Sequence, residues 1–383
     1  MSSPEPTPIP TPTDAMQTPA PWREVAAQPS VTGVEFHDVI WTGTRFVATA
    51  SAGDRGVILD SDDGLVWHEQ SGGQKGKFPG DLAVGPDGVL ALGSIGRRLA
   101  TWTSPDGLTW TVHPKAFPAM PDGSRFNEDT VQVTDVVATD KGWLAVGRRD
   151  PGCQINCGLD PERAYVWTST DGARWTRIAD QKAFKGAGMD AVARGDAGFV
   201  AAGTAHGDAA IWTSPDGVRW SRIPDDPTFH GPGSMWLGEV DVAMRDGVVA
   251  VIGTFNSHDA ARARAWWSSD GRTWSKASVA KARDAALHGV AATPDGFLAT
   301  GWSLGCPGST NPDPYRSRGA VWATTDGRAW RCDVPDAGSQ GFSAGMAAAS
   351  DTVEVVVGST DPDDEDEESA PPRVGVVWYR TRP

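Results

Sequence analysis

An aspartate opens a short apolar segment at five places in this chain of 383 residues: Asp38, Asp81, Asp135, Asp190 and Asp241. If these segments converge, their carboxylates form a ring whose oxygens can bind Ca²⁺ or a cationic ligand. The same side chains can instead accept hydrogen bonds from backbone N–H groups where neighbouring structural units meet. Because the aspartates recur at equivalent positions in the sequence pattern, the structural role is favoured over the ligand site.

Two further binding candidates lie outside this pattern. The acidic run Asp361–Glu368 contains Asp361, Asp363 and Asp364, which have the oxygen ligands of a calcium loop, although blocks of like charge are usually solvated. Trp236 stands apart from the repeats described below, and it is the tryptophan that we expect to stack on a sugar ring. Apart from Ca²⁺, the sequence indicates no cofactor.

The four cysteines allow three pairings. Local pairing, Cys153–Cys157 and Cys306–Cys332, is favoured because each bond then closes a loop within one repeated unit. A zinc site is the alternative, but the spacing of Cys153 and Cys157 is unusual for zinc and no histidine is near them in sequence. Disulfides predict an oxidising compartment.

Charge and composition narrow the class of partner. The net charge of −15 and the pI of about 4.8 argue against nucleic acids and anionic membranes. No run of about 20 apolar residues is present, so no membrane span is predicted. Residues 1–20 are rich in Pro and Thr and are expected to form a disordered tether. Such tethers often follow an export signal or a lipid-anchored cysteine, so we expect an extracellular or cell-envelope protein whose signal precedes this start.

A nine-residue stretch with a tryptophan at each end is repeated along the chain. WTSPDGLTW occupies Trp102–Trp110, WTSTDGARW occupies Trp167–Trp175 and WTSPDGVRW occupies Trp212–Trp220. The same spacing gives the pairs Trp266–Trp274 and Trp322–Trp330, while Leu59 replaces the first tryptophan before Trp67. Eighteen tryptophans in one chain therefore indicate a repeated structural use.

Each repeat is expected to contain four strands. Two continuous apolar runs, as in Thr134–Gly147, are typical of strands covered on both faces. The tryptophan-flanked stretch then predicts a hairpin with Pro105–Asp106–Gly107 as its turn, which would place Trp102 directly opposite Trp110. We expect these tryptophans to pack against the neighbouring repeat.

The two ends of the chain supply one split repeat. A seventh unit begins at Gly345 and reaches its third strand at Trp378, where the chain ends. The stretch Pro21–Ala26 resembles a fourth strand and predicts that Trp22 is the partner of Trp378. The sequence therefore predicts an all-β protein, a seven-bladed β-propeller of four-stranded blades over residues 21–383, closed by the N-terminal strand.

The hairpin resembles the Asp-box, or BNR, repeat of the sialidase-like propeller superfamily, Ser-x-Asp-x-Gly-x-x-Trp. Ser104, Asp106 and Trp110 fit it, as do Ser214, Asp216 and Trp220, and Asp270 with Trp274 beside Ser269. Here the glycine follows the aspartate at once, so the box is one residue short. The resemblance implies a propeller. Sialidase activity would also need an arginine triad for the substrate carboxylate, a Tyr–Glu nucleophile pair and an aspartate as the acid. Arg222–Pro224 has the family's Arg-Ile-Pro letters in the wrong place, so no catalytic residue is assigned.

Three long links between second and third strands are expected on one face of the ring: Arg148–Val166, Trp302–Val321 and Ser359–Val377. Long loops on rigid scaffolds often carry binding sites, although insertions can also merely cover the blades. We predict a monomeric, non-enzymatic, exported binding or scaffold module that presents this face to a protein or a glycan. A sialidase-type glycoside hydrolase is the alternative, and an assembly factor for a membrane complex is a third reading.

Overall fold

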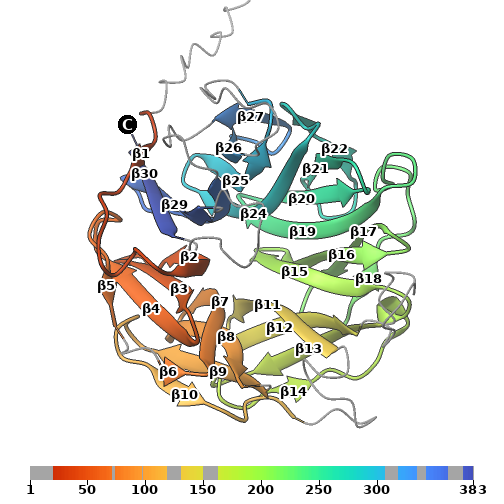
Figure 1. Ribbon diagram of the computed structural model, residues 1–383. Coiled ribbons are helices and arrows are strands. Elements are labelled where there is room, and N and C mark those ends of the chain that lie inside the picture. Colours follow the sequence, from red (N-terminus) through yellow and green to blue (C-terminus); the bar gives the residue numbers. More distant parts are fainter. Residues whose placement is uncertain are drawn as a thin grey trace, which may run out of the picture.

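The computed structural model is a ring of seven four-stranded blades around a central channel (Figure 1). It describes residues 20–70, 74–96, 98–118, 131–149, 163–306, 318–333, 342–360 and 374–382. The predicted all-β propeller is confirmed, since the described residues contain one short 3-10 helix, η1 (Lys182–Phe184), and are otherwise strands and turns. None of the helical structure in these ranges has the length and apolarity needed to cross a membrane.

The first four blades follow the chain in order, each running from the channel outward. Blade 1 contains β2 (Glu35–Trp41), β3 (Phe46–Ala52), β4 (Arg55–Ser61) and β5 (His68–Glu69), with β6 (Gln74–Lys75) also on β4. Blade 2 contains β7 (Lys77–Gly85), β8 (Gly88–Ile95), β9 (Arg98–Ser104) and β10 (Thr111–His113). Blade 3 contains β11 (Val131–Thr139), β12 (Gly142–Arg149), β13 (Arg163–Ser169) and β14 (Thr176–Arg177). Blade 4 contains β15 (Gly188–Gly195), β16 (Gly198–Ala205), β17 (Asp208–Ser214) and β18 (Ser221–Arg222).

The remaining three blades complete the ring. Blade 5 contains β19 (Trp236–Arg245), β20 (Val248–Asn256), β21 (Ala261–Ser268) and β22 (Ser275–Lys276). Blade 6 contains β24 (Ala285–Thr293), β25 (Gly296–Ser303), β26 (Arg318–Thr324) and β27 (Ala329–Asp333), beside which β23 (Ser278–Val279) runs parallel. Blade 7 contains β28 (Phe342–Ala349), β29 (Val353–Thr360), β30 (Gly375–Thr381) and β1 (Arg23–Glu24).

The N-terminal strand closes the ring as predicted. β1 pairs antiparallel with β30, Arg23 opposite Tyr379 and Glu24 opposite Trp378. Trp22 is 4% exposed, and the Arg380 guanidinium lies 4.5 Å from the centre of its ring. Strands from the two ends of the chain therefore share one blade, and β1 covers the edge of β30 that would otherwise be unpaired.

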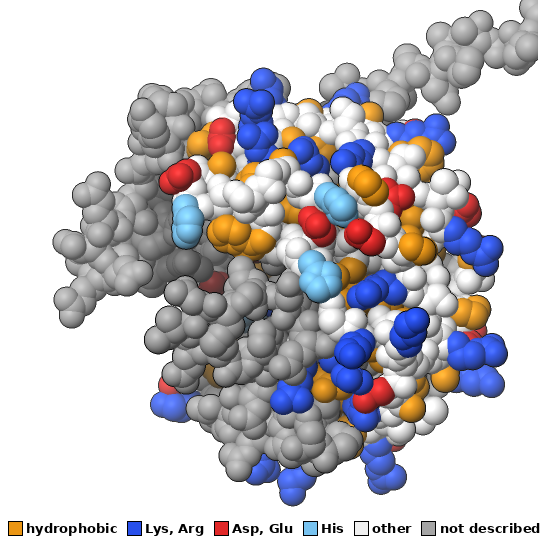
Figure 2. Space-filling model, turned by 90° about the vertical axis from the view of Figure 1, so that its right-hand side faces the viewer, with side chains coloured by type: hydrophobic (Ala, Val, Ile, Leu, Met, Phe, Trp, Pro, Cys, Tyr) orange, Lys and Arg blue, Asp and Glu red, His pale blue; other side chains and the backbone are white. Residues whose placement is uncertain are grey.

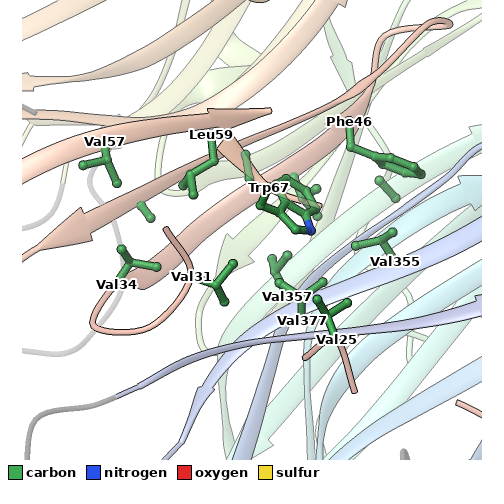
Figure 3. Packing of buried hydrophobic residues seen from close by; sticks show 14 residues of the cluster. Val25, Val31, Val34, Phe46, Val57, Leu59, Trp67, Val355, Val357 and Val377 are labelled. Carbon is green, nitrogen blue, oxygen red and sulfur yellow. The ribbon is translucent and has the colours of Figure 1, made fainter. Parts of the chain in front are cut away.

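The hydrophobic cores lie between blades. Each of the seven buried clusters combines residues of two consecutive blades. At the interface that closes the ring, Trp67 of blade 1 packs against Val355, Val357 and Val377 of blade 7 (Figure 3). The expectation that hairpin tryptophans wedge against a neighbouring blade is confirmed at this interface.

The hairpin between third and fourth strands is held by the same hydrogen bonds in repeat after repeat. In blade 2, the Gly107 N–H donates to Ser104 Oγ at 2.8 Å, and Asp106 Oδ1 accepts from the N–H groups of Leu108 and Thr109 at 2.9 Å each. The Trp110 Nε1–H donates to the Gly107 carbonyl at 3.1 Å. The bond from glycine N–H to the hydroxyl recurs in all six described hairpins of this kind, on Ser61, Ser104, Ser169, Ser214, Ser268 and Thr324.

Glycine is required at the hairpin tip for two reasons. Gly107 has a φ of +77°, and a Cβ there would lie 2.9 Å from Val47 Cγ2 of blade 1. At Gly217 a Cβ would lie 2.6 Å from Leu144 Cδ1 of blade 3. The tip thus packs directly against the preceding blade, which leaves no room for a side chain at this position.

The prediction that the two hairpin tryptophans lie directly opposite each other is wrong. Trp102 is opposite Val112, Trp167 is opposite Arg177 and Trp378 is opposite Glu24. The other three pairs are displaced in the same way, with Trp212 opposite Arg222, Trp266 opposite Lys276 and Trp322 opposite Cys332. The turn aspartate accepts hydrogen bonds from the next backbone N–H groups and so prolongs the turn, and the second tryptophan lies two residues before the residue that is opposite the first.

The tryptophans of a pair nevertheless share one core. Phe117, in the link from blade 2 to blade 3, lies 5.9 Å from Trp167 and stacks at 5.0 Å on Trp175. Phe229 bridges Trp266 and Trp274 in the same manner, at 6.1 and 5.9 Å. A phenylalanine from the link therefore joins the two rings where direct pairing was expected.

The predicted Cys306–Cys332 disulfide is present, with a Cα–Cα distance of 5.7 Å. It ties the residue after Gly305 to β27 within blade 6. Cys153 and Cys157 lie outside the described residues, and so do Asp361, Asp363 and Asp364.

Replacing Trp22 by Ala should lower the free energy of unfolding by about 3–5 kcal/mol, because a buried indole is lost from the closing blade. Urea unfolding followed by circular dichroism measures this change. Arg23→Ala, an exposed neighbour in β1, is the matched control and should shift stability by less than about 0.5 kcal/mol. Equal midpoints for Trp22→Ala and the wild type would contradict closure by β1.

Candidate functional site

The first strands line the channel, and the five predicted aspartates lie on them in two settings. Asp38, Asp135 and Asp241 are paired residues, opposite Thr49, Val146 and Ile252 of the second strands. Asp81 and Asp190 lie instead inside the β-bulges of β7 and β15. A bulge shifts the register by one residue, so the equivalence of all five that the sequence suggests does not extend to their backbone positions.

The three paired aspartates join one blade to the next. Asp38 accepts hydrogen bonds from its neighbour Val39 N–H and from Leu82 N–H of blade 2, both at 2.7 Å. Asp135 does the same with Val136 at 2.6 Å and Val192 of blade 4 at 2.7 Å. These bonds are those expected of the structural role.

Asp241 repeats the arrangement between blades 5 and 6, with Val242 and Val290 N–H groups at 2.7 Å each. The pattern therefore alternates around the ring and connects blades 1 and 2, 3 and 4, and 5 and 6. We call these three side chains the channel bridges.

Asp81 is the exception, because the donors that it would use are already taken. The Leu82 N–H donates to Asp38 and the Val136 N–H donates to Asp135. The remaining backbone donor near the Asp81 carboxyl is its own N–H. Asp190 has a different environment, since it pairs with Arg148 of blade 3 and accepts from Thr204 Oγ1 at 3.2 Å.

Burial in the channel raises the pKa of these carboxyls. Burial, opposed only by its own N–H and reinforced by the charge of Asp241, raises the pKa of Asp81 to about 7. Burial likewise raises the pKa of Asp241 to about 6, although two N–H bonds act in the other direction. For Asp38 and Asp135, burial and the neighbouring carboxylates hold the pKa well above its usual range. The channel therefore carries less negative charge at neutral pH than the sequence alone suggests.

The described residues contain no group of three His, Cys, Asp or Glu side chains placed to hold a metal ion. The channel bridges direct their oxygens at backbone N–H groups, which leaves them poorly arranged as a calcium cage. The candidate calcium loop at Asp361–Glu368 lies outside the described residues.

One cleft lies on the face where the third-to-fourth strand hairpins emerge, the hairpin face. It has a volume of about 680 Å³ between blades 3 and 4, and Trp143, Asp171 and Asp216 line it. Through Arg194 it meets a cavity of about 650 Å³ at the channel mouth. Arg194 is paired with Asp140 and lies 5.8 Å from the centre of the Phe199 ring, so its charge is already satisfied.

A second kind of cleft lies on the opposite face, where the second-to-third strand links and the links between blades emerge. We call this the link face. A cavity of about 530 Å³ at the edge of blades 5 and 6 is lined by Ala282, Gly305 and four cationic side chains, Arg262, Arg264, Lys281 and Arg283. We call it the blade 5 basic pocket. Burial and the nearby charge of Arg262 lower the pKa of Arg264.

Sequence reasoning missed this pocket because its residues come from separate segments. Arg262 and Arg264 belong to β21, whereas Lys281 and Arg283 belong to the link to blade 6. The available signal was the alternation Ala-Arg-Ala-Arg-Ala at 261–265, which puts two arginines on one face of a strand. Figure 2 shows the side of the ring that contains blades 4 and 5, where basic side chains gather along the upper edge and in the lower half.

Trp236 lies at the link-face end of β19. Its side chain is half-buried, it is opposite Asn256 in β20, and its ring makes an edge contact with His258 at 6.0 Å. An aromatic face, an amide and an imidazole are therefore close together on the same end of blade 5 as the basic pocket.

The sequence matches no protein-family model, and no curated protein matches it. Solved structures with a similar fold are a sialidase and other β-propellers. The sialidase of Trypanosoma rangeli is 13% identical with a TM-score of 0.44, over 94% of this chain and 60% of the sialidase. A puromycin hydrolase is 13% identical with a TM-score of 0.51, over 85% of this chain and 50% of that protein. A protein from Lactobacillus plantarum is 11% identical with a TM-score of 0.48, over 81% of this chain and 89% of that one.

The chain thus spans 60% and 50% of the lengths of the sialidase and the puromycin hydrolase. At these identities the similarity is one of fold, and it assigns no ligand or reaction.

Asp81→Asn should stabilise the protein above pH 7 by roughly 1–2 kcal/mol, after allowance for water in the channel. The folded-state pKa of about 7 exceeds the unfolded value of about 3.9, so the contribution of the protonated carboxyl is complete below about pH 3.9 and is lost as pH rises through 7. The wild-type melting temperature should therefore fall between pH 5 and pH 8, and the variant should show a smaller fall.

The exposed Asp87→Asn, in the turn after β7, is the matched control and should follow the wild-type curve. Parallel melting curves for Asp81→Asn and Asp87→Asn across this range would show that Asp81 does not titrate as described.

Proposed function

We propose that this protein is an exported binding module that engages a glycan on its link face and catalyses no reaction of its own. The observation that carries the proposal is Trp236, an aromatic side chain that remains half-exposed at the end of β19 although most tryptophans of the repeated hairpins are buried. Sugar rings stack on such faces, and neighbouring amide and imidazole groups can bond their hydroxyls. Asn256 and His258 supply those groups here.

The channel supports the same proposal. Asp38, Asp135 and Asp241 each accept two backbone N–H bonds between blades, which makes them structural groups that hold the scaffold. The Cys306–Cys332 disulfide supports an oxidising compartment outside the cytoplasm. The six hairpins are, in this proposal, shortened Asp-boxes, since in each of them the glycine N–H donates to a Ser or Thr hydroxyl in a turn that also contains an aspartate.

Trp236→Ala should weaken binding of the full chain to its glycan by at least about tenfold, the loss expected when a stacking aromatic is removed. A glycan array identifies the ligand, and calorimetric titration then measures the affinity. Trp267→Ala is the matched control, because Trp267 is also half-buried in blade 5 but lies near the hairpin face. Equal glycan affinity of Trp236→Ala and the wild type would show that the glycan site does not include Trp236.

A second function, hydrolysis of glycosides, is favoured by one observation. Asp81 has a pKa near 7 and is not used as a bridge between blades, so its carboxyl is protonated often enough at neutral pH to act as a general acid. The fold similarity to sialidases is distant and adds no residue to this alternative.

A binding module should leave a panel of fluorogenic glycosides, sialosides included, uncleaved above the heat-denatured control, with or without Ca²⁺. A sharp thermal transition of the same sample shows that the protein tested is folded. Turnover that Asp81→Asn abolishes would replace the binding module with the hydrolase.

A further inference from the structure

The outer edge of blade 5 brings like charges together without neutralising them. Arg262 in β21 and Arg283 in the following link form an isolated antiparallel bridge, so their side chains share one face of the sheet. Arg264, two residues further along β21, lies on that face as well. Like charges directly opposite each other destabilise a strand pair. The chain has a net charge of −15, so acidic side chains that could neutralise these arginines are abundant in its sequence.

Carboxylates do not compensate this cluster in the described part of the chain. No ion pair within 4.0 Å joins Arg262, Arg264, Lys281 or Arg283 to an acidic side chain there. Asp284 follows Arg283 directly and its N–H donates to the Ala261 carbonyl at 3.0 Å, but its carboxylate forms no ion pair within 4.0 Å with any of these four cations.

Blade 3 has an equivalent bridge between two cationic residues, but there an acidic side chain neutralises the charge. The two blades can therefore be compared within one chain. Arg163 of β13 is opposite Lys185 of the link, in the same kind of isolated antiparallel bridge. There, Asp180 lies 2.9 Å from Arg163 and 2.6 Å from Arg177. The repeat can therefore place an acid at this edge, and in blade 5 it does not.

The backbone of the blade 5 basic pocket is fixed in place. The link is held to β21 by a hydrogen bond from Ala263 N–H to the Ala282 carbonyl at 2.9 Å. Lys281 and Asp284, at φ +55° and +50°, are two of the four non-glycine residues with positive φ in the described chain. Such conformations are unfavourable for residues with a Cβ and persist where the surrounding structure imposes them. On the other side, Gly305 precedes the Cys306–Cys332 disulfide.

We infer that the blade 5 basic pocket binds the oxyanion groups, sulfate or carboxylate, of an acidic glycan. The guanidinium groups of Arg262, Arg264 and Arg283 offer paired N–H donors that match an oxyanion, and Lys281 adds a point charge. A cavity of about 530 Å³ has room for a charged sugar unit. The inference names the class of glycan for the proposed function and rests on it, because Trp236 and the pocket lie at the same end of blade 5.

The test compares two double variants of the full chain that remove the same charge from equivalent bridges. Arg262→Gln/Arg283→Gln changes blade 5, and Arg163→Gln/Lys185→Gln changes blade 3. Calorimetric titration uses inorganic pyrophosphate, a hexasaccharide whose only charged groups are sulfates, a carboxylated hexasaccharide without sulfate, and the uncharged, desulfated form of the sulfated hexasaccharide. The blade 5 variant should lose at least about tenfold in affinity for pyrophosphate and for the charged hexasaccharide that binds, while the blade 3 variant stays within about twofold.

The outcomes separate this inference from the proposed function. No binding of pyrophosphate or of either charged hexasaccharide to the wild type would overturn the anion pocket, and the array result for Trp236→Ala would still stand. Equal losses of affinity in both double variants would show that only the net charge of the protein matters, and would also overturn the blade 5 basic pocket as the binding site. Binding of the desulfated sugar as tightly as the sulfated one would support the glycan module and overturn the oxyanion pocket. Thermal melts of both variants confirm that they are folded.

Discussion

Each blade of this propeller buries its apolar surface against its neighbours, so no blade has a core of its own. Every blade therefore needs both of its neighbours to bury its apolar residues, and the ring of seven clusters is complete only when β1 joins β30. The hairpin glycines follow from the same requirement. Gly107 lies against Val47 of the preceding blade, where any side chain would push two blades apart.

The aspartate bridges around the channel occur at every second interface, between blades 1 and 2, 3 and 4, and 5 and 6. Between blades 6 and 7, Thr300 Oγ1 donates to the Gly345 carbonyl near the channel. A backbone N–H can satisfy one acceptor well, so a bridge from one blade excludes an identical bridge from the next. Asp81 forms no such bridge because the N–H groups of Leu82 and Val136 already donate to Asp38 and Asp135.

Much of the fold could be predicted from the sequence because the information is local and repeated. Seven units, the split blade with Trp22 and Trp378, and the Cys306–Cys332 bond all follow from residues close in sequence or from matching copies. The register of strand pairing was harder to predict from the sequence. Trp102 and Trp110 are displaced because Asp106 extends the turn, and Asp190 differs from Asp135 because it lies within a bulge. Neither one-residue effect leaves a mark in the repeated letters.

The candidate site was still harder to foresee, since Arg262 and Arg283 meet only through a bridge between a strand and a link. Pairings of that kind depend on the path of the link over the blade edge, which composition does not determine.

The split blade also has a consequence for how the chain acquires its structure during synthesis. β1 leaves the ribosome long before β30, the strand with which it pairs, and Trp22 has no core to enter until then. Six blades can stack progressively from one neighbour to the next, but the seventh forms by a contact between the two ends of the chain. Ring closure therefore has to wait for β30, and until it occurs the free edge of β30 and the apolar faces of blades 1 and 7 are exposed to self-association and to chaperones.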